Sequence, residues 1–321
     1  DEDYDTFTGL VFDSLGMVPE DGEQDIEEYV MGLMNAKIQS DAGTLAHPPI
    51  IIDTTVMPII PIPQFWTETV VIARQTPLLR TKWGQGAPFN NNYPLYSSGI
   101  GRYPACCVAI AVAQAMYYNR FPNNLGSVYF NWDLIYEYEI FQASPSSYAT
   151  NEVANFIGCI TDYLEPSIGA YEIFSHYDDA VRVLSNSGYN DVLCSSYSLS
   201  KVIDMVNYNS LPIILFAQDA TNTNKAHSWL IDGCNVYKVE HWERNFQTQF
   251  TYTDTLESVD EYNLVHCNYG WDGSCDGYYT SGIFDIRESL PSDMIDTTVD
   301  DKVGNLNYQL TYDIKVITYN L

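Results

Sequence analysis

The chain has 321 residues, of which 46% are hydrophobic, and this length and composition allow one large domain with a substantial core. Its 14 basic and 42 acidic residues give a formal net charge of −28, which argues against nucleic acid or an anionic membrane surface as a partner. A transmembrane segment is also excluded, because the longest apolar stretch, residues 48–65, contains five prolines and Asp53.

The first residues are acidic, with Asp1, Glu2, Asp3 and Asp5 close together. Such a charge run is commonly a solvated tail, and it also resembles the sequence that follows the lipidated cysteine of some Gram-negative surface lipoproteins. The chain opens without methionine or an apolar signal region, so we expect that a targeting peptide precedes it. The protein is therefore expected to be secreted, or held at the cell surface through a residue before Asp1.

Residues 1–74 differ in character from the rest of the chain. Apolar side chains at helical spacing predict an amphipathic helix over residues 25–38, which needs a partner surface. The following stretch to about residue 75 is rich in proline and isoleucine, which forbids helix and central strand. We interpret it as a segment that crosses the surface of the main domain, residues 75–321.

The main domain begins with a loop rich in Gly, Asn and Pro and then reaches an apolar helix at residues 107–119, which should be buried on most sides. Two helical patterns follow at residues 151–162 and 176–185. Strand patterns follow at residues 211–219, 227–235, 262–268 and 277–286. Helices before strands, without βαβ alternation, predict an α+β fold in which a helical half packs on an antiparallel sheet half.

Cys107 lies in the first turn of the apolar helix, where the helix dipole and unpaired amides should lower its pKa and favour a thiolate. This position suits a nucleophile. A cysteine in apolar surroundings is more often structural, and we assign that role to Cys106. Seven cysteines without a CxxC pair give no zinc-site spacing, and no calcium-binding loop pattern is present, so neither metal nor cofactor is predicted.

Three further residues complete a candidate site. His227 begins the strand HSWLIDG after a polar loop, so its ring can face a cleft as a base. Asn268 ends the strand LVHCN, where its amide can accept a hydrogen bond from the imidazole and orient it. Gln85, in WGQG, can donate to the oxyanion of a tetrahedral intermediate. Each of these residue types also has a common structural role, but Gln, Cys, His and Asn in this order match the papain-like proteases.

The motifs WGQGAPFN, CVAIAVAQAMYYNRFP, HSWLIDG and HCNYGWDGSCDGYY resemble the streptopain (C10) cysteine peptidases and occur in the family's order. The resemblance implies a papain-like fold with Cys107 as nucleophile and His227 as base and acid. It further implies that Asn268 orients His227, that Gln85 donates to the oxyanion and that Trp271 shields this polar pair from water.

The resemblance also implies a zymogen, in which residues 1–74 inhibit the peptidase domain at residues 75–321. The sequence differs from the family pattern at two places. Tyr269 stands where the family usually has tryptophan, and a long polar insertion, expected to form a hairpin, separates His227 from Asn268. The expected partner is a protein or peptide substrate. The alternatives are an acyl transferase or amidase on the same fold, and a surface binding module whose catalytic residues are silent.

Overall fold

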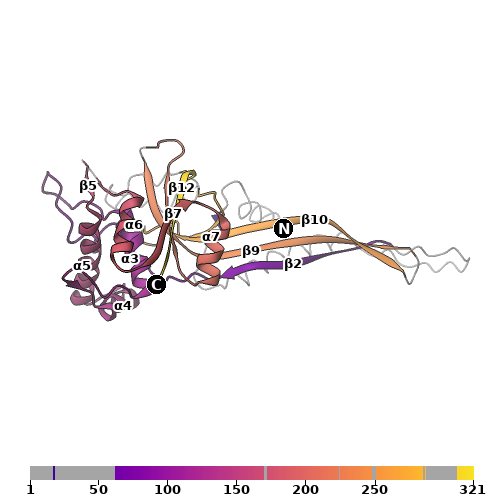
Figure 1. Ribbon diagram of the computed structural model, residues 1–321, viewed down its shortest axis with the longest axis horizontal. Helices are drawn as coiled ribbons and strands as arrows, with labels where there is room; N and C mark the ends of the chain where they lie inside the picture. Colours follow the sequence, from indigo (N-terminus) through magenta and orange to yellow (C-terminus); the bar gives the residue numbers. More distant parts are fainter. Residues whose placement is uncertain are drawn as a thin grey trace, which may run out of the picture.

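The computed structural model describes residues 17–18, 62–169, 172–223, 225–247, 251–284, 286 and 309–321. The helix predicted at residues 25–38 lies outside the described residues. In the described part, a group of helices packs on an eight-stranded sheet whose strand pairs are all antiparallel, and a narrow arm of strands extends away from this body (Figure 1). The predicted α+β fold is confirmed.

The helix at the centre of the body, α3 (Cys107–Asn119), has the predicted bounds. Its residues from Val108 to Tyr117 are all buried, and the helix contacts strands β8 and β9 as well as helices α5 and α6. It ends where Arg120 adopts the left-handed conformation, with φ 47°, shortly before Pro122. Because α3 is apolar on all sides, its burial fixes the position of Cys107 at the N-terminal end.

The other helices surround α3 or the sheet. Two of them begin at side-chain caps: Asn131 accepts from Leu134 N at 3.2 Å, and Ser146 accepts from Ala149 N at 3.1 Å. The helix that begins after Asn131 was not predicted, and the next one is longer than the predicted range 151–162. Within the described part of the chain, no helix combines the length and the apolar composition needed to cross a bilayer. The helices are α4 (Trp132–Ile140), α5 (Ser147–Leu164), α6 (Tyr177–Asn186), α7 (Leu199–Val202) and a π-helical turn (Ile203–Tyr208).

The sheet has the strand order β1-β11-β10-β9-β8-β12-β7, and β2 also pairs with β9. Two short hairpins, β3 with β4 and β5 with β6, lie outside it. The strands of the main sheet are β1 (Met17–Val18), β2 (Gln64–Gln75), β7 (Asn190–Ser196), β8 (Ile213–Gln218), β9 (Ala226–Phe246), β10 (Tyr252–Asn268), β11 (Gly277–Thr280) and β12 (Tyr312–Asn320). The short hairpins are β3 (Asn124–Leu125), β4 (Val128–Tyr129), β5 (Ser167–Ile168) and β6 (Ile173–Phe174).

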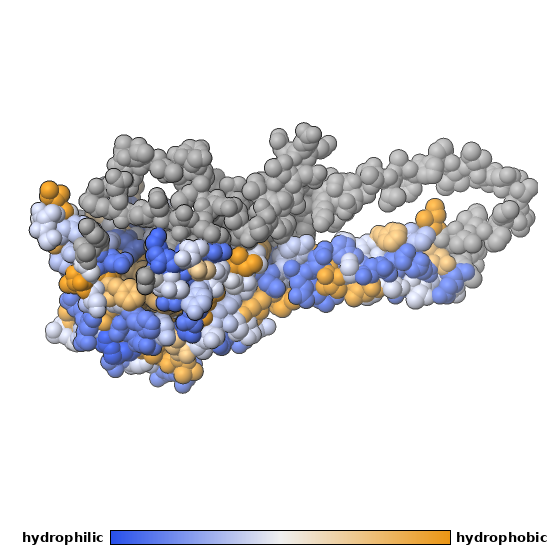
Figure 2. Space-filling view, turned by 90° about the horizontal axis from the view of Figure 1, so that it is seen from above, coloured by the Kyte–Doolittle hydropathy of each residue, from blue (hydrophilic) through white to orange (hydrophobic). Residues whose placement is uncertain are grey.

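The arm consists of β2 and the outer parts of β9 and β10, so the insertion after His227 forms the expected hairpin. Along one edge of β9, β8 pairs with residues 226–231 and β2 pairs with residues 234–244. Strand β2, which contains the last residues of the proline-rich segment, is therefore an edge strand. This agrees with the prediction that the segment cannot form a central strand. Figure 2 shows hydrophilic and hydrophobic residues interspersed along the arm.

Candidate active site

Cys107 and His227 come together from two different elements, the first turn of α3 and the beginning of β9. Helix α3 packs against β9, and the backbone N–H of Ser228, the residue after His227, is close enough to the Cys107 thiol to favour its ionised form. Cys107 is partly exposed, whereas the neighbouring Cys106 is only 1% exposed. Of the two adjacent thiols, Cys107 is therefore the one that a substrate can reach.

The ring of His227 is held by a main-chain carbonyl. Its Nε2 lies 2.8 Å from the carbonyl oxygen of Tyr269, and since a carbonyl only accepts, Nε2 carries the hydrogen. The neutral ring therefore has its basic lone pair on Nδ1. The peptide that supplies this carbonyl is fixed in turn, because its own N–H, that of Gly270, donates to Asn268 Oδ1 at 3.2 Å. The preceding peptide is fixed as well, since Tyr269 N donates to Asp276 Oδ1 at 2.8 Å.

Trp271 covers the imidazole, as the sequence predicts. The two rings stack with centroids 4.1 Å apart at 28°, and His227 is only 4% exposed. Burial lowers the pKa of His227 to about 4, against the smaller opposing effect of its hydrogen bond to Tyr269. The ring is consequently neutral at neutral pH and able to accept a proton.

The ionisation of the nucleophile differs from the expectation. The thiols of Cys106 and Cys107 lie close enough to affect each other's ionisation, and the neighbouring thiol together with burial raises the pKa of Cys107. The neighbouring thiol and the nearby amides of Ala109 and Val108 lower the pKa of Cys106 to about 7. The helix N-terminus thus stabilises one negative charge shared by a pair of thiols, and the prediction of a lowered pKa at Cys107 itself is wrong for this state.

Asn268 lies close to the site but does not accept from His227. Its Oδ1 accepts from Gln114 Nε2 at 3.1 Å and from Gly270 N at 3.2 Å. Its Nδ2 donates to the carbonyl oxygen of Thr81 at 2.7 Å. The expected hydrogen bond to the imidazole is corrected: the carbonyl of the next residue, Tyr269, makes it, and Asn268 ties β10 to α3 and to the loop before Gln85.

Gln85 lies between the start of α3 and the indole of Trp271. Its Oε1 accepts from Trp271 Nε1 at 2.9 Å, and its Nε2 donates to the carbonyl oxygen of Ala105 at 2.5 Å. Ala105 N donates back to the Gln85 carbonyl at 2.7 Å. These bonds fix the amide beside the residues that precede Cys107 and leave the second hydrogen of Nε2 for another acceptor.

The sequence analysis missed two contributors to this site. The Tyr269 carbonyl has no side-chain signature and could not be found from residue types. Gln114 could have been predicted, because a polar residue in the middle of an otherwise apolar helix needs a buried hydrogen-bond partner. Its side chain is only 1% exposed. It also accepts a hydrogen bond from the Thr81 hydroxyl.

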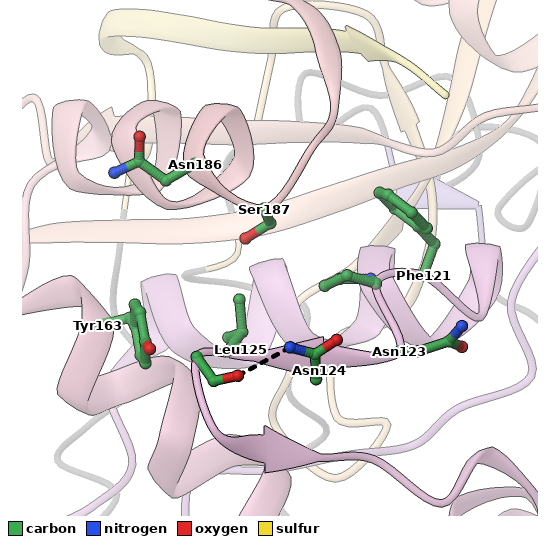
Figure 3. Close-up of a pocket in the computed structure, with 9 residues that line it drawn as sticks. Phe121, Asn123, Asn124, Leu125, Tyr163, Asn186 and Ser187 are labelled. Carbon is green, nitrogen blue, oxygen red and sulfur yellow. Dashed lines mark hydrogen bonds between the residues drawn. The ribbon is translucent and has the colours of Figure 1, made fainter.

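Two cavities lie at the other end of α3, away from Cys107. One, of about 410 Å³, is lined mainly by Asn, Ser and aromatic side chains, including Phe121, Tyr163 and Asn186 (Figure 3). The second, of about 460 Å³, is lined by residues that include Arg80, Arg120 and Tyr117. Neither contains a predicted site residue, so we locate the candidate site by the contacts of Cys107 and His227.

Comparisons with known proteins agree with this geometry. The sequence profile of the peptidase C10 family matches residues 83–279. A search of curated proteins finds no match. Active wild-type interpain A, a cysteine protease of Prevotella intermedia, has a similar structure, with a TM-score of 0.55 and 19% identity over 77% of this chain and 95% of that chain. A mutant fragment of prointerpain A from the same organism matches with a TM-score of 0.52 and 18% identity over 94% of this chain and 84% of that chain.

Proposed function

Because this chain belongs to the peptidase C10 family and is a cysteine-type peptidase, we propose that it is an endopeptidase with Cys107 as nucleophile and His227 as general base. The observation that carries the proposal is the closeness of the Cys107 thiol to the backbone N–H of Ser228, since Ser228 directly follows His227 in β9. A buried neutral imidazole next to a partly exposed thiol is the arrangement that nucleophilic catalysis needs.

The proposed reaction starts with transfer of a proton from the thiol pair to Nδ1 of His227. The Cys107 sulfur attacks the scissile carbonyl carbon, and the resulting oxyanion accepts a hydrogen bond from the second N–H of the Gln85 amide. His227 then donates its proton to the leaving amine, which gives a thioester. Water, deprotonated by His227, hydrolyses the thioester and restores the thiol.

The Tyr269 carbonyl supports this proposal because it becomes a better partner as His227 gains charge. Its hydrogen bond to Nε2–H strengthens when the ring is protonated, whereas burial alone disfavours the imidazolium. The stacked indole of Trp271 excludes water from one face of the imidazole ring. Together these groups allow His227 to accept a proton during the reaction and to donate it again to the leaving amine.

The experiment follows the products formed from denatured casein. We expect new amine termini in the ratio of one for each cleaved bond, and no cleavage by Cys107→Ala. Transfer of the acyl group to an added amine, without new carboxyl termini, would instead support an acyl transferase. Absence of both reactions, after nicking of the N-terminal segment by an added protease, would favour the binding module.

We also propose that residues 1–74 inhibit the peptidase until they are cleaved. Two contacts support this: β1 pairs with β11, next to the strand that carries Asn268, and β2 pairs with β9, the strand that carries His227. Intact mass should show that the wild-type chain loses an N-terminal piece ending between about residues 65 and 82 during a day in reducing buffer. A Cys107→Ala chain that loses the same piece would contradict self-cleavage.

A further inference from the structure

The residue before the proposed nucleophile is a second cysteine, and the reaction proposed above does not require it to be one. Cys106 is 1% exposed and precedes α3 in the extended conformation, with φ −62° and ψ 131°. Its thiol is adjacent to that of Cys107 and close enough for each to change the pKa of the other. The sequence analysis assigned Cys106 a purely structural role.

We propose that Cys106 and Cys107 form a redox modification site, in which Cys106 is the resolving thiol for an oxidised Cys107. The proposal rests on the function of Cys107 as the nucleophile. Hydrogen peroxide is the oxidant, and a vicinal disulfide that stops peptide hydrolysis is the product. A thiol reductant reverses the reaction.

The first step takes place at the sulfur that solvent reaches. After transfer of a proton from the thiol pair to His227, the Cys107 thiolate attacks one oxygen of hydrogen peroxide, the O–O bond breaks, and the hydroxide that leaves is protonated to water. Cys107 is thereby oxidised to the sulfenic acid. Partial exposure of Cys107 and burial of Cys106 restrict this step to Cys107.

The second step joins two adjacent residues, so no distant part of the chain has to move. The Cys106 sulfur attacks the Cys107 sulfur, the S–O bond breaks, and hydroxide leaves and is protonated to water. Overall, two thiols and one peroxide give one disulfide and two waters. The amides of Ala109 and Val108 in the first turn of α3 lower the pKa of Cys106 and so favour its thiolate, which is the attacking form.

The geometry also predicts that the disulfide is easily reduced. Adjacent α-carbons lie about 3.8 Å apart across a trans peptide, below the range of about 4.4–6.8 Å that disulfides usually bridge. Strain of this kind makes a disulfide more reducible. A disulfide between Cys106 and Cys107 is therefore suited to reversible inhibition of peptide hydrolysis.

Several hydrogen bonds at the helix start resist closure of the ring. Cys106 O accepts the first bond of α3, from Ile110 N at 3.0 Å, and Cys106 N donates to Tyr93 Oη at 3.2 Å. Gln85 holds the preceding carbonyl of Ala105. Ring closure disturbs these bonds and removes the nucleophile, so the disulfide form should be inactive and should return to the dithiol when a reductant is present.

The test uses the tryptic peptide 103–120, which contains Cys106 and Cys107 and no other cysteine. The whole protein is treated with hydrogen peroxide, quenched, alkylated with iodoacetamide and digested without reduction. The expected wild-type peptide is unalkylated and about 2 Da lighter than the dithiol, because two hydrogens are lost. Dithiothreitol should restore both the dithiol mass and the casein-cleaving activity.

Cys106→Ser removes the resolving thiol and should leave Cys107 open to further oxidation. Its peptide is expected to become about 32 Da heavier through two added oxygens, and activity should not return with dithiothreitol. Cys159→Ser, which removes a partly exposed thiol on α5, is the matched control and should behave as wild type.

The proposal is overturned if the wild-type peptide gains oxygen irreversibly, or if its disulfide joins it to another peptide. The wild-type mass decides this without any variant, so a Cys106→Ser chain that fails to fold does not affect the outcome. The mass is also independent of activity. Failure of the endopeptidase proposal would appear separately, as casein cleavage that survives in Cys107→Ala.

Discussion

The two halves of β9 carry one histidine each, and the two side chains have opposite surroundings. In the inner half, His227 is buried under Trp271 and bonded to a main-chain carbonyl. In the outer half, His241 lies partly exposed on the arm, with Nε2 2.9 Å from Asp260 Oδ2. The same residue type on the same strand is thus a candidate base in one half and a surface hydrogen-bond partner of a carboxyl group in the other.

The difference follows from what covers each half. The inner half packs against α3 and β8 and its residues are buried through Tyr237. Among the described residues, pairs within and between strands hold the outer half, such as the Trp66–Trp242 stack at 6.1 Å and the Arg244–Asp254 pair at 2.7 Å. Exposed pairs of this kind contribute little to the free energy of unfolding. Substitutions in the two halves should therefore differ in kind as well as in size.

The largest expected effect is on catalysis. His227→Ala removes the proposed general base and should lower kcat/KM for peptide hydrolysis by about 10²–10⁴-fold. His241→Ala, on the same strand, should leave the rate unchanged because its ring faces Asp260 on the arm. Equal rate losses in both variants, measured on a short fluorogenic peptide, would mean that β9 acts only as a scaffold.

Asn268 should matter first for stability. Asn268→Ala leaves the Thr81 carbonyl and the Gln114 amide without their buried partner, and we expect the free energy of unfolding to fall by about 3 kcal/mol. Asn245→Ala, whose amide contacts Glu243 on the arm, should change it by less than about 0.5 kcal/mol. Urea unfolding of both variants measures the difference. A stable Asn268→Ala protein with a rate as low as that of His227→Ala would restore a direct catalytic role.

The buried histidine should also make stability depend on pH. The pKa of His227 is about 4 in the folded chain, below its ordinary value of 6.5, so between these values the unfolded chain binds one more proton. The free energy of unfolding therefore falls as the pH falls from 6.5 toward 4, by up to about 3 kcal/mol from this group. Wild type should lose more stability over this range than His227→Gln. Parallel curves for the two proteins would show that His227 is protonated in the folded state.

The smallest effect is expected on the arm. The Arg244 guanidinium pairs with Asp254 and lies 3.9 Å from the ring centroid of Tyr252. Because this cluster is exposed to solvent, Arg244→Gln should leave the free energy of unfolding, measured in urea, almost unchanged and should leave peptide hydrolysis unchanged. Loss of peptidase activity in this variant would indicate that the arm and the site are coupled.

The sequence predicted those parts of the fold in which a local pattern decides the structure. The helix at residues 107–119 was found with its bounds because its apolar run ends at Phe121 and Pro122. The hairpin was found because a long polar insertion separates two apolar strand patterns. What could not be predicted is that β2 pairs along the hairpin from Gln64 to Gln75, since that register depends on contacts between distant segments.

The candidate site shows the same limit. Residue types and order brought Cys107, His227, Gln85 and Trp271 together correctly as neighbours. They misplaced the hydrogen bond to the imidazole, because a main-chain carbonyl at Tyr269 leaves no trace in residue types. They also missed the effect of Cys106 on the ionisation of Cys107, which requires knowing that the two thiols lie close to each other.

The most direct test of the central claim compares casein cleavage by wild type, Cys107→Ala and Cys159→Ala at equal concentration, with new amine termini as the readout. Cys159 is a partly exposed thiol on α5, so its variant controls for the loss of a cysteine as such. We expect equal cleavage by wild type and Cys159→Ala and none by Cys107→Ala. Cleavage by Cys107→Ala at the wild-type rate would contradict it.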